Sequence, residues 1–165
     1  MRHLLSLLLF AAVSLTASAR LGENEQELIK RFGQPLSQTP EKFFAQGKFI
    51  TIGTALTFQQ ESWRITAVLT ENRCSKITYT HPGDWTENQF TTTLTANCQA
   101  SKWTDTSSTD QGFRKLSRNW KRADGGTASW TMAGTSLVIT NPAYNRTKEK
   151  AEAKAKAETS RIPKI

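Results

Sequence analysis

The sequence predicts an α+β domain in which an antiparallel sheet of about six strands carries two helices on one face. Three observations support this. Apolar residues follow a helical spacing in two separate stretches, and they alternate with polar residues in several other stretches. Short polar joins of the kind found in β-hairpins separate the alternating stretches. The 165-residue chain is long enough for one such domain and too short for a multidomain enzyme.

The N-terminus has the features of a secretory signal peptide. Arg2 and His3 precede an apolar run, Leu4–Leu15, and the small-x-small pattern of Ala17–Ala19 follows it. The apolar run is shorter than the roughly 20 residues that a membrane-spanning helix needs. We therefore expect residues 1–19 to be a signal peptide cleaved near Ala19. The mature chain, which has no transmembrane segment, would then be periplasmic or secreted.

The first helix is predicted between Gly22 and Phe32. Leu28 and Phe32 lie four residues apart and form an apolar stripe, while Asn24 with Glu27 resembles a capping box. The Gly-x-Pro sequence that follows ends the helix.

A meander of strands is predicted next, after a loop around Ser37–Lys42. Apolar and polar residues alternate over residues 56–59, 63–70 and 76–80, which indicates strands with one buried face. Residues 43–52 could add an earlier strand, although their glycines weaken the pattern.

A second helix and three more strands follow the turn at His81–Asp84. Asp84 with Glu87, or Thr86 with Gln89, could cap the helix. A Ser/Thr-rich loop is expected at residues 100–112, before strands at Leu116–Arg122, Thr127–Met132 and Thr135–Asn141. The order suggests a duplicated unit of one helix plus three strands.

Positive charge is concentrated at the C-terminus. The formal net charge is +8, and residues 146–165 carry seven basic and three acidic side chains, against 14 and 11 in residues 20–145. Residues 148–158 contain only Ala, Lys and Glu, which indicates a solvated helix or a disordered segment. We therefore divide the chain into the signal peptide, a single domain at 20–145 and a charged tail at 146–165. Because the domain is mildly basic and exported, nucleic acid is an unfavoured partner.

The two cysteines allow one disulfide, and the sequence does not decide whether it forms. Cys74 and Cys98 are the only pair, and an oxidising compartment would favour a bridge between them. The alternation of the strand places Cys74 on the solvent side, which argues against the bridge.

No catalytic, cofactor-binding or metal-binding motif is evident. His81 is the only histidine after the signal peptide, it lies in a turn, and no G-x-S-x-G nucleophile motif accompanies it. One histidine and two distant cysteines do not supply a tetrahedral metal site. We therefore predict that the protein is not an enzyme. The alternative is an exported hydrolase whose residues converge only in the folded chain.

Basic and aromatic residues interleave around Trp120, and two further tryptophans lie at a helix entry and in a loop. The stretch could bind an anionic surface, but a strand with a core aromatic and solvated cations is the favoured interpretation. The candidate contact residues are Trp85, Trp103, Arg114, Lys115, Arg118 and Lys121.

Five segments resemble a group of small exported bacterial proteins of unknown function. They read LGENEQELIKRFGQP, TFQQESWRITAVLTENRCSKITY, NQFTTTLTANC, NWKRADGGTASW and TSLVIT. In architecture the chain is also similar to the small lipoprotein of the barrel-assembly machinery and to the secreted β-lactamase inhibitory protein. The resemblance implies export, a shared fold and binding of a protein. We therefore predict a non-enzymatic module that binds a protein or an envelope component through the sheet's polar face, its loops and its basic tail.

Overall fold

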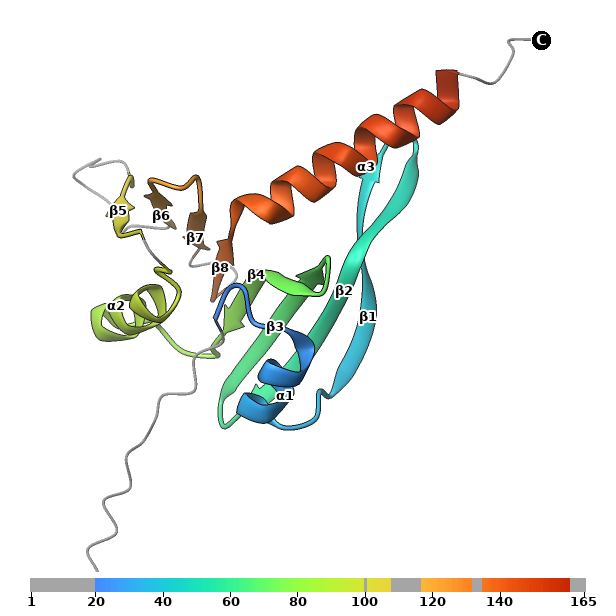
Figure 1. Ribbon diagram of the computed structural model, residues 1–165. Coiled ribbons are helices and arrows are strands. Elements are labelled where there is room, and N and C mark those ends of the chain that lie inside the picture. Colours follow the sequence, from blue (N-terminus) through green and yellow to red (C-terminus); the bar gives the residue numbers. More distant parts are fainter. Residues whose placement is uncertain (1–19, 100, 108–116, 132–134, 161–165) are drawn as a thin grey trace, which may run out of the picture.

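The computed structural model describes residues 20–99, 101–107, 117–131 and 135–160. In these residues an antiparallel sheet carries three helices, so the α+β class is confirmed (Figure 1). The described part of the chain has eight strands and not about six, and it has a third helix. None of the described helices is both long and apolar enough to cross a bilayer. The elements in chain order are α1 (Glu25–Phe32), β1 (Ser37–Ala45), β2 (Lys48–Gln60), β3 (Trp63–Thr70), β4 (Arg73–Thr80), α2 (Glu87–Ala96), β5 (Trp103–Asp105), β6 (Ser117–Arg122), β7 (Thr127–Thr131), β8 (Ser136–Thr140) and α3 (Pro142–Ser160).

The sheet consists of two four-stranded meanders that meet at their last strands. The strand order is β1-β2-β3-β4-β8-β7-β6-β5, and every pair of neighbours is antiparallel. At the centre, Ile77 of β4 lies opposite Ile139 of β8. The described elements before α3 therefore repeat one helix plus four strands, and not the expected three strands.

The expected loop at Ser37–Lys42 is wrong, because these residues belong to β1. Pro40 is compatible with this strand because β1 lies at the edge of the sheet, where one side makes no ladder hydrogen bonds. Gly53 lies inside β2, where a Cβ atom would sit 2.1 Å from the Leu69 carbonyl oxygen. The glycine thus permits a close approach to β3 and does not interrupt the strand.

Two further segments differ from expectation. Trp103–Asp105, expected in a loop, forms the short edge strand β5 against β6. The Ala/Lys/Glu-rich segment is helical, and its helix α3 begins at Pro142, before the boundary expected at residue 145. Ala155 of α3 is buried, so one side of this helix packs against the rest of the fold.

The first two helices are built on the same plan. Asn24 and Thr86 are the N-caps, and each forms a capping box with the residue three positions later. Of the two cap pairs considered for the second helix, the structure has Thr86 with Gln89. Four and eight residues after each cap come the buried side chains, which are Leu28, Phe32, Phe90 and Leu94.

These helices pack on one face of the sheet. The core there is continuous from β2 to β6 and includes Leu56, Phe58, Ile65, Ile77, Tyr79, Leu137, Ile139, Ala128 and Trp120. Aromatic rings extend it beside α2, where Trp85 stacks on Phe90 at 5.0 Å and Phe90 contacts Trp130. The core therefore supports the middle of the sheet from one side.

Helix α3 packs on the opposite side of β1–β4. Tyr144 donates a hydrogen bond to Glu41 (2.6 Å), and Lys76 donates one to the same carboxylate (2.8 Å). Lys76 alternates with the core residue Ile77, so its side chain points away from α1 and α2. Figure 1 shows α3 running from the end of β8 to the tip of the β1–β2 hairpin.

Candidate binding face

The side of the sheet that faces away from α1 and α2 carries two rows of side chains that are polar except for Val138. They alternate along the strands with the core residues, and antiparallel pairing brings them side by side across six strands. We call these twelve residues the polar face. The first row is Thr57, Thr66, Thr78, Val138, Ser129 and Asn119, and the second row is Gln59, Arg64, Thr80, Ser136, Thr131 and Ser117.

The polar face lies beyond the region covered by α3. The helix contacts the sheet at Lys76 and Glu41, reaches the β3–β4 turn through the Lys150–Glu71 ion pair (3.7 Å), and ends beside Lys48. All of these contacts lie in the Lys76 row or beyond it, on the side away from the polar face. Accordingly, six of the twelve side chains are exposed, the other six are half-buried, and none is buried.

The chemistry of this face is dominated by hydroxyl groups. Hydroxyls both donate and accept hydrogen bonds, and short side chains lose little conformational freedom when they are ordered. Neighbouring hydroxyls already pair across strands, at 3.4 Å between Thr57 and Thr66 and 2.9 Å between Thr80 and Ser136. Arg64 is the one ionisable residue among the twelve. The face therefore suits a polar partner surface better than a strongly charged one.

An open depression continues this side of the sheet past β6. It has a volume of about 590 Å³, and its lining includes Lys102, Thr104, Thr106 and Lys121. Lys121 and Thr104 lie opposite each other in the row next to the polar face. Among the predicted contact residues that the structure describes, Lys121 is thus the one that lies beside the polar face.

The predicted contact residues do not form one surface. Trp85 is buried, and its indole N–H donates to the Thr135 carbonyl oxygen (3.0 Å). Trp103 packs against the core and donates to the Leu94 carbonyl oxygen (2.7 Å). Both tryptophans therefore pack beside α2. Arg114 and Lys115 lie outside the described residues.

Two of the three cations of β6 differ from the favoured interpretation, in which all were solvated, whereas Lys121 is exposed as expected. Trp120 is in the core as expected, but Arg118 and Arg122 point to the same side as Trp120. The Arg118 side chain is only 15% exposed, lies over the Trp120 ring at 4.8 Å, and pairs with Glu87 and Asp105. Burial favours the neutral acid of Asp105, but hydrogen bonds from Ser107 and Arg118 outweigh it and lower its pKa to about 2.

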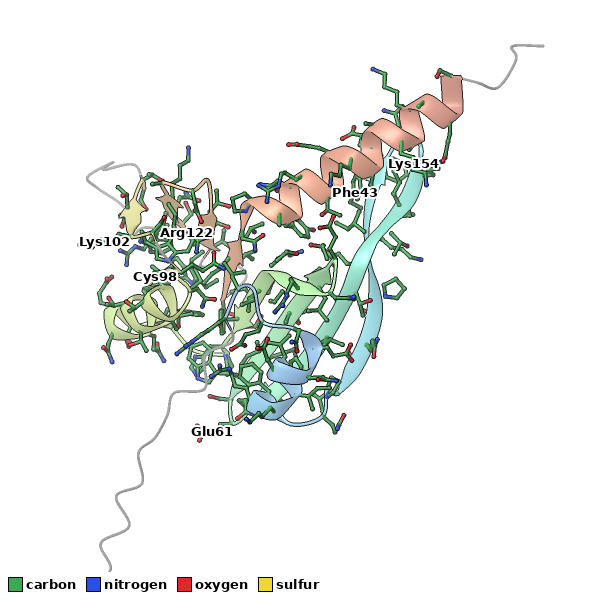
Figure 2. All side chains as sticks on the ribbon, in the orientation of Figure 1. Phe43, Glu61, Cys98, Lys102, Arg122 and Lys154 are labelled. Carbon is green, nitrogen blue, oxygen red and sulfur yellow. The ribbon has the colours of Figure 1, made fainter. Side chains whose placement is uncertain are left out.

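Arg122 is a structural residue (Figure 2). Its side chain has no exposed surface, and it donates to the Asn97 carbonyl oxygen (2.6 Å) and to Asp124 (2.7 Å). The guanidinium also lies over the Trp103 ring at 4.9 Å. Burial opposes ionisation of Asp124, but the Gly126 amide and Arg122 outweigh it and lower the pKa of this carboxyl. Through its contacts with Asp124 and with the Asn97 carbonyl oxygen, Arg122 ties the β6–β7 turn to the end of α2.

Both cysteines are free thiols in the structure, and Cys74 corrects the expected alternation. Cys74 is fully buried, although the strand pattern placed it on the solvent side. The register shifts between Val68 and Leu69, so that Leu69 lies opposite Cys74 while Val68 lies opposite Lys76. This β-bulge inserts Ser75 and turns Cys74 into the core. Burial raises the pKa of the Cys74 thiol.

His81 lies in an aromatic and backbone environment. Its ring is 4.5 Å from the Trp63 ring, and its Nδ1 accepts a hydrogen bond from the Gly83 amide (3.1 Å). Among the described residues, the imidazole thus contacts a tryptophan ring and the backbone of its own turn.

Three titratable side chains meet between α3 and the sheet. Burial would raise the pKa of Glu41, but hydrogen bonds from Lys76 and Tyr144 outweigh it and lower the pKa. Burial and the Glu41 carboxylate both raise the pKa of Tyr144, so its phenol remains a donor. A neutral phenol and an ammonium group on one carboxylate form a stable polar contact that holds α3 on the sheet.

The described residues hold no group of three or more potential metal ligands. No protein-family model matches the chain, and neither a curated protein nor a solved structure matches it.

Proposed function

We propose that this protein is an exported, non-enzymatic module that binds a protein or a component of the cell envelope through its polar face. The observation that carries the proposal is the pair of aligned polar rows, which lie on the α3 side of the sheet in the part that no described helix covers. Hydroxyl and amide side chains on a rigid sheet adapt to many polar partners at low entropic cost.

The size of the polar face indicates how the partner would bind. Six strands span about 24 Å, and two rows of side chains cover on the order of 300 Å². A standard protein interface buries about 800 Å² on each partner, so the partner would also contact surfaces beside the rows. The depression near Lys121 is the nearest polar surface on that side.

Export places the partner in the envelope or outside the cell. This part of the proposal rests on the sequence of residues 1–19, which has the pattern of a signal peptide.

The core beneath the polar face keeps the strands in register, so the binding residues are held in place without a ligand.

The test is affinity capture from envelope extracts of the native host with matched variants. Ser129→Arg with Thr131→Arg adds bulk and charge at two exposed positions of the polar face. Gln26→Arg with Asn88→Arg makes the same chemical change at exposed positions of α1 and α2. We expect the wild type and the helix variant to enrich the same partner, and the polar-face variant to lose at least about tenfold of it.

Two results would overturn the proposal. One is reproducible capture of the same partner by the polar-face variant at the wild-type level. The other is the absence of any specific partner in extracts from envelope and culture medium. Circular dichroism and thermal unfolding of each variant establish that the fold is intact.

A further inference from the structure

The β1–β2 hairpin ends in an exposed aromatic pair. Gln46 and Gly47 form its turn, and both have positive φ (51° and 73°), as a two-residue type I′ turn requires. Phe44 lies directly opposite Phe49, one residue away from the turn on each strand. Figure 1 shows this tip beside the C-terminal part of α3.

The two phenylalanines belong to no core. Their side chains are 64% and 71% exposed, and their rings contact each other edge to face at 5.3 Å. Phe43 is on the other side of the ribbon, where Lys148 of α3 lies over its ring at 5.2 Å. Helix α3 therefore covers one side of the hairpin and leaves Phe44 and Phe49 on the other. Together they present on the order of 250 Å² of apolar surface.

Basic residues outnumber acidic ones in the hairpin turn region and in α3, the two segments that meet at this end of the molecule. Residues 42–48 and 142–160 carry seven basic and three acidic side chains. Lys42 precedes Phe44 by two positions, so it lies on the same side of the ribbon as the aromatic pair. Of these side chains, Lys48 is paired with Glu158 at 3.5 Å and Lys150 with Glu71 at 3.7 Å. Figure 2 shows Lys154 on α3 near the hairpin tip.

We infer that the hairpin tip binds the surface of an anionic lipid bilayer, with Phe44 and Phe49 inserted among the headgroups and the lysines beside the lipid phosphates. Exposed aromatic residues flanked by cations bind such surfaces through apolar burial and electrostatic attraction. The tip is a narrow projection whose apolar area is well below the roughly 800 Å² of a standard protein interface. Binding to a bilayer does not need an interface of that size, because the insertion of a few apolar side chains is enough. This site is separate from the polar face, so it stands or fails independently of the proposed function.

Vesicle co-sedimentation tests the inference. The purified chain starts at Arg20, where the described fold begins, so that the apolar leader does not contribute. Phe44→Ser with Phe49→Ser removes the aromatic pair. Leu36→Ser is the matched control, because Leu36 is 66% exposed and lies just before β1, at the end away from the tip. Lys42→Glu reverses the charge beside the pair and keeps both rings.

The wild type is expected to bind vesicles of phosphatidylglycerol and phosphatidylethanolamine at least about tenfold better than phosphatidylcholine vesicles, and less well in high salt. The double Phe variant should lose about tenfold in binding, Lys42→Glu severalfold, and Leu36→Ser less than about twofold. Absence of wild-type binding, or equal binding by the double Phe variant, would overturn the inference. A third result would also overturn it: the wild type does not bind vesicles, and the double Phe variant fails to capture a protein partner from extracts that the wild type captures. The tip would then bind a protein. Thermal unfolding of each variant confirms that it is folded.

Discussion

Asn97 connects three segments that are distant in the sequence. It is fully buried after the end of α2, its Oδ1 accepts a hydrogen bond from the Leu21 amide (3.2 Å), and its Nδ2 donates to the Tyr79 hydroxyl (3.1 Å). Its carbonyl oxygen accepts from Arg122. A buried amide with all of these partners fixes the N-terminal segment, α2 and the sheet relative to one another.

We therefore expect Asn97→Ala to destabilise the protein by about 2–3 kcal/mol, because it removes the acceptor of the buried Leu21 amide and leaves a cavity where a fully buried side chain was. Chemical denaturation with and without the substitution measures this. Asn88→Ala, at an exposed position in α2, is the control and should change the free energy of unfolding by less than about 0.5 kcal/mol. A loss at position 97 no larger than the control's would contradict the assigned role.

Glu41 gives the stability a specific pH dependence. Its pKa is lower in the folded chain than the ordinary value of 4.5. The ionised carboxylate therefore stabilises the fold above the unfolded pKa, and this stabilisation is lost as the pH falls through the lower folded value. Glu41→Gln should cost about 1 kcal/mol at pH 7, and the difference from wild type should vanish well below pH 4.5.

Thermal unfolding over a pH series checks this prediction. Glu152→Gln changes an exposed carboxylate on α3 and is the matched control. A stability difference between wild type and Glu41→Gln that persists unchanged into acid would contradict it.

At the scale of elements, α3 is a helix held by few contacts. Ala155 is buried, whereas Ala153, two residues earlier, is exposed. Ala155→Glu places a carboxylate into the packed side, so we expect α3 to leave the sheet and its backbone amides to exchange roughly tenfold faster. Hydrogen exchange of residues 142–160 measures this. Ala153→Glu should leave the exchange rates near those of wild type, and equal effects of the two substitutions would refute the packing described.

The sequence predicts those elements whose own residues carry the signal. The capping box at Asn24 and the alternation from Trp63 to Ala67 are local features, and the structure confirms both. The alternation fails at Val68, which it places on the solvent side and which is buried. By contrast, β1 depends on Pro40 lying at a sheet edge, and β5 depends on pairing with β6. Both strands depend on the assembled sheet, so the periodicity of their own residues does not predict them.

The same limit applies to the candidate site. Alternation predicts that Thr66 and Thr78 point away from the core, and they do. Their alignment with Ser129 and Asn119 requires the pairing of β4 with β8, which are separated by more than fifty residues of sequence. The burial of Cys74 follows from a bulge that no alternation rule anticipates.

At the scale of the molecule, the core connects the two meanders. Leu28 of α1 and Phe90 of α2 belong to one cluster, and fully buried Ile77 and Ile139 join it at the centre of the sheet. The two helix-plus-four-strand units therefore share their interior, and neither is expected to unfold alone.

We predict one cooperative unfolding transition in which far-UV circular dichroism and tryptophan fluorescence coincide. Ile139→Ala should shift both probes together and cost about 2–5 kcal/mol, because it opens a cavity between the units. Val138→Ala, on the same strand but on the polar face, should cost less than about 1.5 kcal/mol. Two separate transitions, or probes that diverge in the Ile139 variant, would contradict a shared core.

The central claim is that the polar face contacts a partner, and site-specific photo-crosslinking in the native host tests it most directly. A photoreactive side chain is placed at Thr131 on the polar face, or at Asn88 on α2 as the control; both positions are exposed. We predict a discrete covalent adduct from position 131 and none from position 88. Adducts from position 88 alone, or no adduct from position 131 in cells that export the protein, would contradict the claim.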